Sequence, residues 1–172
     1  DIIELSQLDV MDGNMEKAPV DLSDEAQNCV EMLQMHAEKH KITLLAKDIE
    51  KNCIIYGNQN MIQEILYNLC DNAIRYNKPK GHVWVSVFEK DSKIILRVKD
   101  DGIGIAPKEQ ERIFERFYRV DKARSKKTGG TGLGLAIVKH IAEQHSAEIV
   151  IKSEIGQGTV ISIEFTKNEK DA

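Results

Sequence analysis

Four polar side chains recur along a predicted helix at a spacing that places them on one face. Glu64, Asn68, Asn72 and Arg75 stand at i, i+4, i+8 and i+11 within residues 58–77. At roughly 100° of rotation per residue they share an arc of roughly 80°, opposite an apolar face. Because Asn is a poor helix former, two of them in mid-helix suggest a role beyond solvation. An amide oxygen suits Mg²⁺ and an Arg suits phosphate, so the stripe predicts a phosphate site with Mg²⁺; the alternative is an ordinary solvated face.

A second group of candidate residues follows a predicted strand, in the stretch VKDDGIGIA at 98–106. Asp100 ends the strand, and its carboxylate can accept hydrogen bonds, for example from an exocyclic amino group. Gly102 and Gly104 let the backbone bend and approach a flat ligand closely. The alternative is an acidic turn without a ligand.

A third group lies where another helix begins, in KKTGGTGLGLAIVKH at 126–140, with Gly130, Gly132 and Gly134 alternating. The N–H groups of a helix N-terminus favour phosphate. Neither the Walker pattern nor the dinucleotide pattern fits, since Gly134 is followed by Leu135 and the glycine spacing differs. The alternative to a phosphate turn is a hinge.

Basic residues gather in the loop 119–130, just before these glycines. They are Arg119, Lys122, Arg124, Lys126 and Lys127. A net charge of −4, from 24 basic and 28 acidic side chains, argues against a nucleic-acid binder that works by bulk electrostatics. The cluster could be a solvated loop or a nucleic-acid patch, but beside a phosphate turn it better serves a polyphosphate.

Periodicity and turn signals supply the elements that must position these residues. Helices are expected at about 24–40 (with Ser23 as N-cap), 58–77 (with Asn58 as N-cap), 108–116 (short) and 133–145; strands at 41–49, 52–57, 82–90, 93–100, 148–154 and 159–165. The first two strands read as a hairpin, and Asp91-Ser92 joins the next pair. Because no βαβ alternation is visible, we expect an α/β (α+β) two-layer sandwich: a mixed, mainly antiparallel sheet with about three helices on one face.

Composition fits a globular domain in a reducing compartment. The cysteines, Cys29, Cys53 and Cys70, are isolated, and no apolar run approaches the roughly 18 residues of a membrane span.

We expect residues 1–13 to end a preceding helix, 14–21 to form a polar linker, 22–166 to form the domain and 167–172 a tail. A fragment of a longer protein is therefore expected.

Taken in order, these segments resemble the catalytic, ATP-binding domain of bacterial sensor histidine kinases, in the superfamily shared with gyrase, a mismatch-repair ATPase and a heat-shock chaperone. The likeness covers about residues 20–166. EILYNLCDNAIRY (64–76) resembles the N box, DDGIGI the first glycine box, IFERFYRVD (113–121) the F box, GTGLGL (130–135) the second glycine box and GQGT (156–159) the third. ELSQLD at 4–9 resembles the end of the dimerisation helix.

The resemblance assigns a role to each motif residue. It implies that Asn68 ligates Mg²⁺, that Asn72 and Arg75 face the phosphates, and that Asp100 reads the adenine amino group. Glu64 stands where related ATPases keep a water-activating Glu, and Phe114 and Phe117 stand where the family anchors its lid. The implied catalytic residues are Arg119, Arg124 and Glu64; the implied nucleotide-binding residues are Asn68, Asn72, Arg75, Tyr76, Asp100, Gly102, Gly104, Ile105, Gly130, Thr131, Gly132, Leu133, Gly134 and Thr159. Two departures, Arg75 for the common Lys and Asn77 for a small hydroxyl residue, leave nucleotide binding intact.

The family's phosphoacceptor, a His followed by an acidic residue, is absent. The histidines are His36, His40, His82, His140 and His145, and none has an acidic residue next to it on the C-terminal side. His36 and His40 at i, i+4 could bind a metal, but two exposed histidines are the simpler interpretation.

The implied cofactors are ATP and Mg²⁺. The implied partners are acceptor helices outside this chain and a response regulator, with no nucleic acid; the fragment would be a monomer, and the whole protein a homodimeric, membrane-anchored sensor with this domain in the cytoplasm. Rival functions are a hydrolytic ATPase of the superfamily and a non-catalytic regulatory module.

Overall fold

The computed structural model of the protein describes residues 15–120 and 132–167. Its elements, in chain order, are β1 (Ala18–Asp21), α2 (Leu22–Met32), α3 (Gln34–Lys39), β2 (Thr43–Ile49), β3 (Ile54–Gly57), α4 (Gln59–Arg75), β4 (His82–Lys90), β5 (Lys93–Asp100), the 3-10 turn η1 (Pro107–Glu109), α6 (Gly134–Gln144), β6 (Glu148–Glu154) and β7 (Gly158–Thr166). No helix in the described part of the chain is long and apolar enough to cross a membrane.

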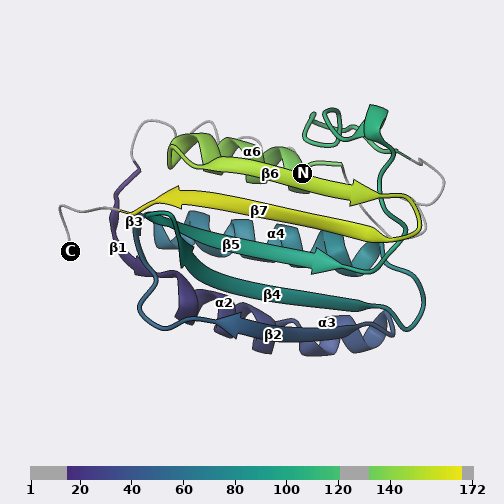
Figure 1. The fold of residues 1–172 in the computed structure, drawn as a ribbon, viewed down its shortest axis with the longest axis horizontal. Helices are drawn as coiled ribbons and strands as arrows, with labels where there is room; N and C mark the ends of the chain where they lie inside the picture. The colour runs from purple at the N-terminus through teal and green to yellow at the C-terminus, as the bar shows by residue number, and fades with distance from the viewer. Residues whose placement is uncertain (1–14, 121–131, 168–172) are drawn as a thin grey trace.

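Five strands form one sheet, in the order β2-β4-β5-β7-β6. All neighbours pair antiparallel except β2 and β4, which are parallel. The helices cover one face of this sheet, and no described element covers the other face (Figure 1). The predicted two-layer sandwich with a mixed, mainly antiparallel sheet is therefore confirmed.

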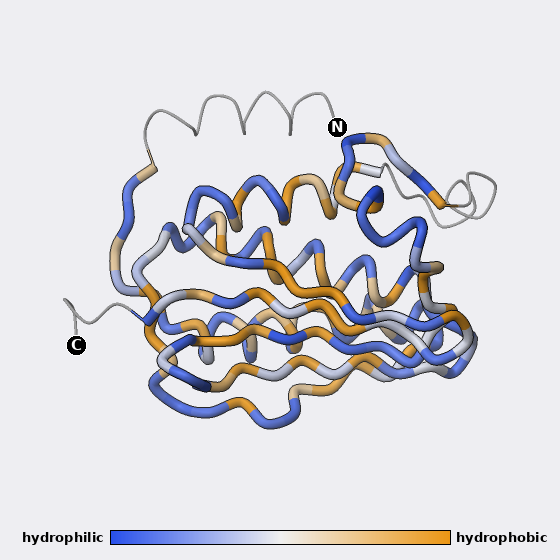
Figure 2. Tube along the Cα trace, turned by 45° about the horizontal axis from the view of Figure 1, so that its top comes forward, coloured by the Kyte–Doolittle hydropathy of each residue, from blue (hydrophilic) through white to orange (hydrophobic). Residues whose placement is uncertain are grey.

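The core lies between the sheet and the helices. Strand residues alternate, so that Val83, Val85 and Val87 of β4 are buried while the residues between them are partly exposed. In α4 the buried residues recur at helical spacing, and Ile62, Ile65 and Leu66 are fully buried. Orange residues accordingly recur along both the strands and the helices (Figure 2). Burial of this apolar surface is the main stabilising contribution and fixes α4 on the sheet.

The predicted hairpin of 41–49 and 52–57 is wrong. β2 pairs with β4 instead, and β3 pairs antiparallel with β1 in a separate two-stranded sheet. Two features turn the chain away from a hairpin: the register of β2 shifts between Ala46 and Ile49, and Asp48 and Asn52 both have positive φ. The chain then returns through α4 to a strand parallel to β2, which is the helix crossover that parallel pairing requires.

Of the two N-caps predicted from the sequence, one is confirmed and the other is wrong. Asn58 caps α4 as predicted, accepting from Met61 N at 3.0 Å. Ser23 is not the cap of the first helix; Asp21 is, and Ser23 Oγ donates to the Glu50 carbonyl instead. That helix also stops at Leu33, so the described residues contain four α-helices. The helix predicted at 108–116 is only a 3-10 turn followed by further turns.

The linker predicted at 14–21 contains β1, so it is not irregular throughout. Pairing with β3 satisfies its backbone groups.

The Asp91-Ser92 turn joins β4 and β5 as predicted, with positive φ at both residues, as a tight hairpin turn requires. The division into domains stays a prediction, and residues 1–14 and 168–172 lie outside the described part.

Candidate functional site

The polar stripe of α4 faces away from the sheet. Glu64, Asn68, Asn72 and Arg75 are all half-buried, whereas the opposite side of the helix is buried in the core. Their half-burial distinguishes them from exposed residues of the same helix such as Gln63 and Tyr67. The stripe is therefore not a fully solvated helix face, which was the alternative for it.

Asn68 is held so that its amide oxygen points at the beginning of α6. Its Nδ2 donates to the Glu64 carbonyl at 2.9 Å, one turn earlier in the same helix. A Cβ placed on Gly134 would lie 3.1 Å from Asn68 Oδ1. With one amide hydrogen committed to the Glu64 carbonyl, the oxygen is the atom directed toward the start of α6. A neutral oxygen donor fits a Mg²⁺ that keeps waters and shares phosphate oxygens.

The N-terminus of α6 supplies the second half of this contact. Gly134 is its first residue, and the preceding Leu133 is fully buried and provides no side-chain cap. The first backbone N–H groups of a helix have no partner within the helix and carry a partial positive charge. Because Gly134 has no side chain, these groups and the Asn68 amide face the same space, and α4 and α6 pack against each other. Of the second glycine box, Gly130 and Thr131 lie outside the described residues.

Asp100, at the end of β5, has one oxygen bonded and one available. Its Oδ1 accepts from Gly102 N at 2.9 Å and from Thr159 N at 3.3 Å. Within 15–120 and 132–167, no hydrogen bond goes to Oδ2. Burial raises the pKa of Asp100 to about 6, although the two backbone hydrogen bonds oppose the shift. A half-buried carboxylate with a free acceptor suits a neutral donor group such as an amino group on a ring.

The neighbouring Asp101 has the opposite character. His82 binds it twice, from its backbone N at 2.6 Å and from Nδ1 at 2.9 Å. Burial by itself would raise the pKa of Asp101, but the His82 hydrogen bonds and nearby positive charge outweigh it and lower that pKa. Asp101 therefore fixes the turn, and Asp100 is the carboxylate able to bind a ligand.

The first glycine box touches the far end of α4. A Cβ on Gly102 would lie 2.8 Å from the carbonyl oxygen of Tyr76, the C-cap of α4, so a side chain there would force the two apart. The contacts at Asn68 and Tyr76 are eight residues apart on one helix, or about 12 Å along its axis. An elongated ligand with an amino-bearing ring at one end and phosphate at the other matches these two ends.

The third glycine box closes the site on the sheet side. Ser153 Oγ accepts from Ile105 N at 2.8 Å and lies 2.7 Å from Thr159 Oγ1. Gly104, with φ +74°, lies against the Glu154 carbonyl, 2.1 Å from where its Cβ would be. Sequence reasoning missed Ser153, because a serine within a strand carries no signal that it ties two glycine turns together.

The F box is bound to the second glycine box. Phe117 N donates to Gly132 O at 3.0 Å, and Gly132 has φ +80° with no room for a Cβ beside the Phe117 backbone. Phe114 packs partly against the core, whereas Phe117 is 57% exposed. Arg119 is half-buried on the same segment, and Arg124 lies outside the described residues.

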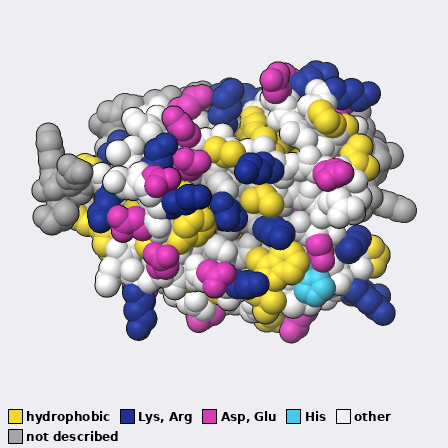
Figure 3. All heavy atoms as spheres, in the orientation of Figure 1, with side chains coloured by type: hydrophobic (Ala, Val, Ile, Leu, Met, Phe, Trp, Pro, Cys, Tyr) yellow, Lys and Arg dark blue, Asp and Glu magenta, His cyan; other side chains and the backbone are white. Residues whose placement is uncertain are grey.

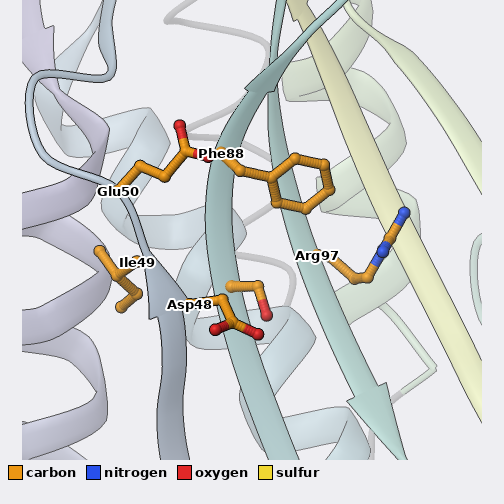
Figure 4. Close-up of a pocket in the computed structure, with 6 residues that line it drawn as sticks. Asp48, Ile49, Glu50, Phe88 and Arg97 are labelled. Carbon is orange, nitrogen blue, oxygen red and sulfur yellow. The ribbon is translucent and has the colours of Figure 1, made fainter.

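Two other features are separate from this site. A pocket of about 450 Å³ is lined by Asp48, Ile49, Glu50, Ser86, Phe88 and Arg97 and contains none of the predicted residues (Figure 4). Basic and acidic side chains are intermixed with hydrophobic ones on the uncovered sheet face (Figure 3). His36 and His40 are both half-buried, His36 bonded to Asp71 and His40 to the His36 carbonyl, so the expectation of two exposed histidines is wrong. No group of three or more metal-binding His, Cys, Asp or Glu side chains occurs among the described residues.

Comparisons with known proteins agree with this geometry. The model of the family "Histidine kinase-, DNA gyrase B-, and HSP90-like ATPase" matches residues 57–169. The sensor histidine kinase WalK of Bacillus subtilis (strain 168) is 34% identical over 172 residues, which are 99% of this chain and 28% of that protein. The chain thus spans little more than a quarter of that relative.

Solved structures give the same result. The mycobacterial sensor histidine kinase MprB superposes with a TM-score of 0.75 at 26% identity, over 87% of this chain and 97% of that one. Full-length ShkA in complex with AMPPNP gives 0.73 at 26%, over 88% of this chain and 31% of that one. The chain therefore belongs to the histidine kinase-, DNA gyrase B- and HSP90-like ATPase family, and within it to the histidine kinase type that its motifs indicate.

Proposed function

We propose that this domain binds ATP with Mg²⁺ and donates the γ-phosphoryl group to a histidine of an acceptor domain outside this chain. One observation carries the proposal: α4 presents the Asn68 amide oxygen to the N-terminus of α6 at one end and contacts the Asp100 turn at the other. The family model and the AMPPNP complex of ShkA support nucleotide binding, since AMPPNP is an ATP analogue.

At the base end, Asp100 would read adenine. Its available Oδ2 accepts from the exocyclic amino group, and Oδ1 stays bound to the Gly102 and Thr159 N–H groups. Guanine carries a carbonyl at the equivalent ring position, so two acceptors would face each other. Gly102, Gly104 and Ile105 form the adjoining wall, and Tyr76 lies at the C-terminal end of α4.

At the phosphate end, α4 and α6 supply neutral and positive donors. The N–H groups in the first turn of α6, which begins at Gly134 directly after Leu133, bind phosphate oxygens, and Asn72 and Arg75 face them from α4. Gly130, Thr131 and Gly132 complete the turn in this proposal. Asn68 would hold Mg²⁺ through its amide oxygen, and the ion would neutralise phosphate charge when bound.

The transfer itself breaks the bond between the γ-phosphorus and the β–γ bridging oxygen and forms a bond to an imidazole nitrogen of the acceptor. The chain contributes position and charge, with no covalent step of its own. Arg119 and Arg124 stabilise the charge on the γ-phosphoryl group as it leaves. Glu64 stands beside Asn68 and can orient the incoming nucleophile.

The acceptor and the response regulator are partners in this proposal, and the whole protein is a homodimeric, membrane-anchored sensor with this domain on the cytoplasmic side. The acceptor histidine is supplied in trans for any test, because none of the five histidines here has the acceptor's acidic neighbour. The fragment is expected to be monomeric.

Hydrolysis of ATP is the second candidate, because the half-buried Glu64 lies on the same stripe as Asn68 and gives its carbonyl to the Asn68 amide. One experiment separates the two. The chain is mixed with γ-labelled ATP, Mg²⁺ and a separately made acceptor-helix domain, and both labelled acceptor and free phosphate are counted. Label on the acceptor at a rate that depends on this chain supports the kinase; free phosphate alone, lost in Glu64→Gln, supports hydrolysis.

A further inference from the structure

Asp71 lies on α4 one turn before Arg75 and binds it in a particular way. Arg75 Nε lies 2.9 Å from Oδ1 and 3.0 Å from Oδ2 of Asp71, so both oxygens share one donor. The terminal Nη groups of Arg75 take no part in this pair, and they form no hydrogen bond with residues 15–120 or 132–167. The guanidinium is therefore held at its base while its outer edge stays available.

A second helix holds the carboxylate. His36 Nε2, from α3, lies 2.7 Å from Asp71 Oδ1. Because a carboxylate can only accept, Nε2 carries the proton. The break at Leu33 starts α3 as a separate short helix, and His40 Nδ1 donates to the His36 carbonyl at 3.0 Å, which anchors this turn. His36, Asp71 and Arg75 thus form a chain of contacts from α3 across α4.

The side chains that make these contacts are shielded enough from solvent to be held in fixed conformations. The side chains of His36, Asp71 and Arg75 are 23%, 19% and 22% exposed. An Arg has several freely rotating bonds, and fixing them when a ligand binds reduces affinity. An Arg whose Nε is already bound to a fixed carboxylate has lost much of that freedom before the ligand arrives.

We propose that Asp71 is a positioning residue, which orients the Arg75 guanidinium so that its Nη edge meets the nucleotide phosphates, and that His36 fixes Asp71 for this purpose. This inference rests on the proposed function and adds two residues to it. It also accounts for an Arg where a Lys is common, since a Lys has no second donor group with which to bind the carboxylate and the phosphate separately.

The test compares ATP·Mg²⁺ with adenosine, which lacks phosphates, by calorimetry on the 172-residue chain. Asp71→Asn should raise the Kd for ATP by roughly five- to tenfold and change that for adenosine by less than about twofold. Glu89→Gln is the matched control, because it makes the same change in an exposed ion pair with Lys167 on the sheet. It should change neither Kd.

A double-mutant comparison separates positioning from a general loss of structure. In an Arg75→Lys background, Asp71→Asn should weaken ATP binding by less than about twofold, because the Nε contact is already gone. An equal loss of ATP affinity in both backgrounds, or an equal loss for ATP and adenosine, would overturn the proposal. No binding of ATP by the unaltered chain would instead be a failure of the proposed function.

His36 is tested by removal and rescue. His36→Ala should raise the Kd for ATP by about two- to threefold and leave adenosine unchanged, and His36→Gln, which keeps an N–H donor, should restore most of the affinity. If Gln and Ala behave alike, or if neither changes the ATP affinity, His36 has no part in orienting Asp71.

Discussion

Asp100→Asn should stabilise the fold at neutral pH while weakening nucleotide binding. The pKa of Asp100 is raised from 3.8 to about 6 by burial. A group with a folded-state pKa above its unfolded value is favoured in its protonated form, so its charge destabilises the fold above pH 6. The shift of roughly two units corresponds to at most about 3 kcal/mol, and partial exposure reduces this to about 1 to 2 kcal/mol.

The substitution keeps the local hydrogen bonds. The amide oxygen of Asn can accept from the Gly102 and Thr159 N–H groups as Oδ1 does now. Its NH₂ group then takes the place of the available Oδ2 and meets the adenine amino group, donor against donor. An unsatisfied donor of this kind costs about 1 to 3 kcal/mol, which is roughly a ten- to hundredfold loss of ATP affinity.

Urea denaturation at pH 7.5 and at pH 4, with calorimetry for ATP, measures both effects. Asp100→Asn should be more stable than the unaltered chain at pH 7.5, and most of the difference should be lost near pH 4, where Asp100 is protonated in the folded state. Asp101→Asn is the control of opposite sign, because the pKa of Asp101 is lowered and its charge stabilises the fold at neutral pH. A destabilised Asp100→Asn, or a difference that does not depend on pH, would refute the reasoning.

Three further predictions follow from the same contacts. Gly134→Ala places a Cβ 3.1 Å from Asn68 Oδ1, so the affinity for ATP·Mg²⁺ should fall about tenfold. The melting temperature should stay the same or rise, because Ala favours a helix. An unchanged affinity would contradict the contact between Gly134 and Asn68. Arg119→Ala should slow phosphotransfer to an added acceptor by 10² or more while changing ATP affinity less than about threefold, and an unchanged transfer rate would exclude that role. Adenosine affinity should decline as the pH falls below about 6, because protonated Asp100 no longer offers two acceptor oxygens; a flat profile between pH 7.5 and 5 would count against Asp100 as the adenine reader.

Much of the fold could be predicted because local patterns and tertiary packing agree. The alternation in β4 and the apolar spacing in α4 both give the buried face directly. The hairpin of the first two strands failed because β3 has only four residues and its partner, β1, lies more than thirty residues earlier. Nothing local indicates that a short strand prefers such a distant partner over its neighbour.

The candidate site, like the fold, could be predicted from the sequence only in part. Asn68 and Gly134 are each visible as unusual residues, but their contact comes from the packing of α4 against α6. Asp71 stands four residues before Arg75, a spacing typical of a helical ion pair. Its second partner, His36, is 35 residues away on α3, and no local pattern predicts that contact.

The most direct test of one nucleotide spanning α4 is a crystal structure of this chain with AMPPNP and Mg²⁺. We predict the adenine amino group within hydrogen-bond distance of Asp100 Oδ2 and the phosphates between Asn68, Arg75 and the start of α6. A nucleotide bound elsewhere, for example in the pocket beside Phe88 and Arg97, would contradict the account.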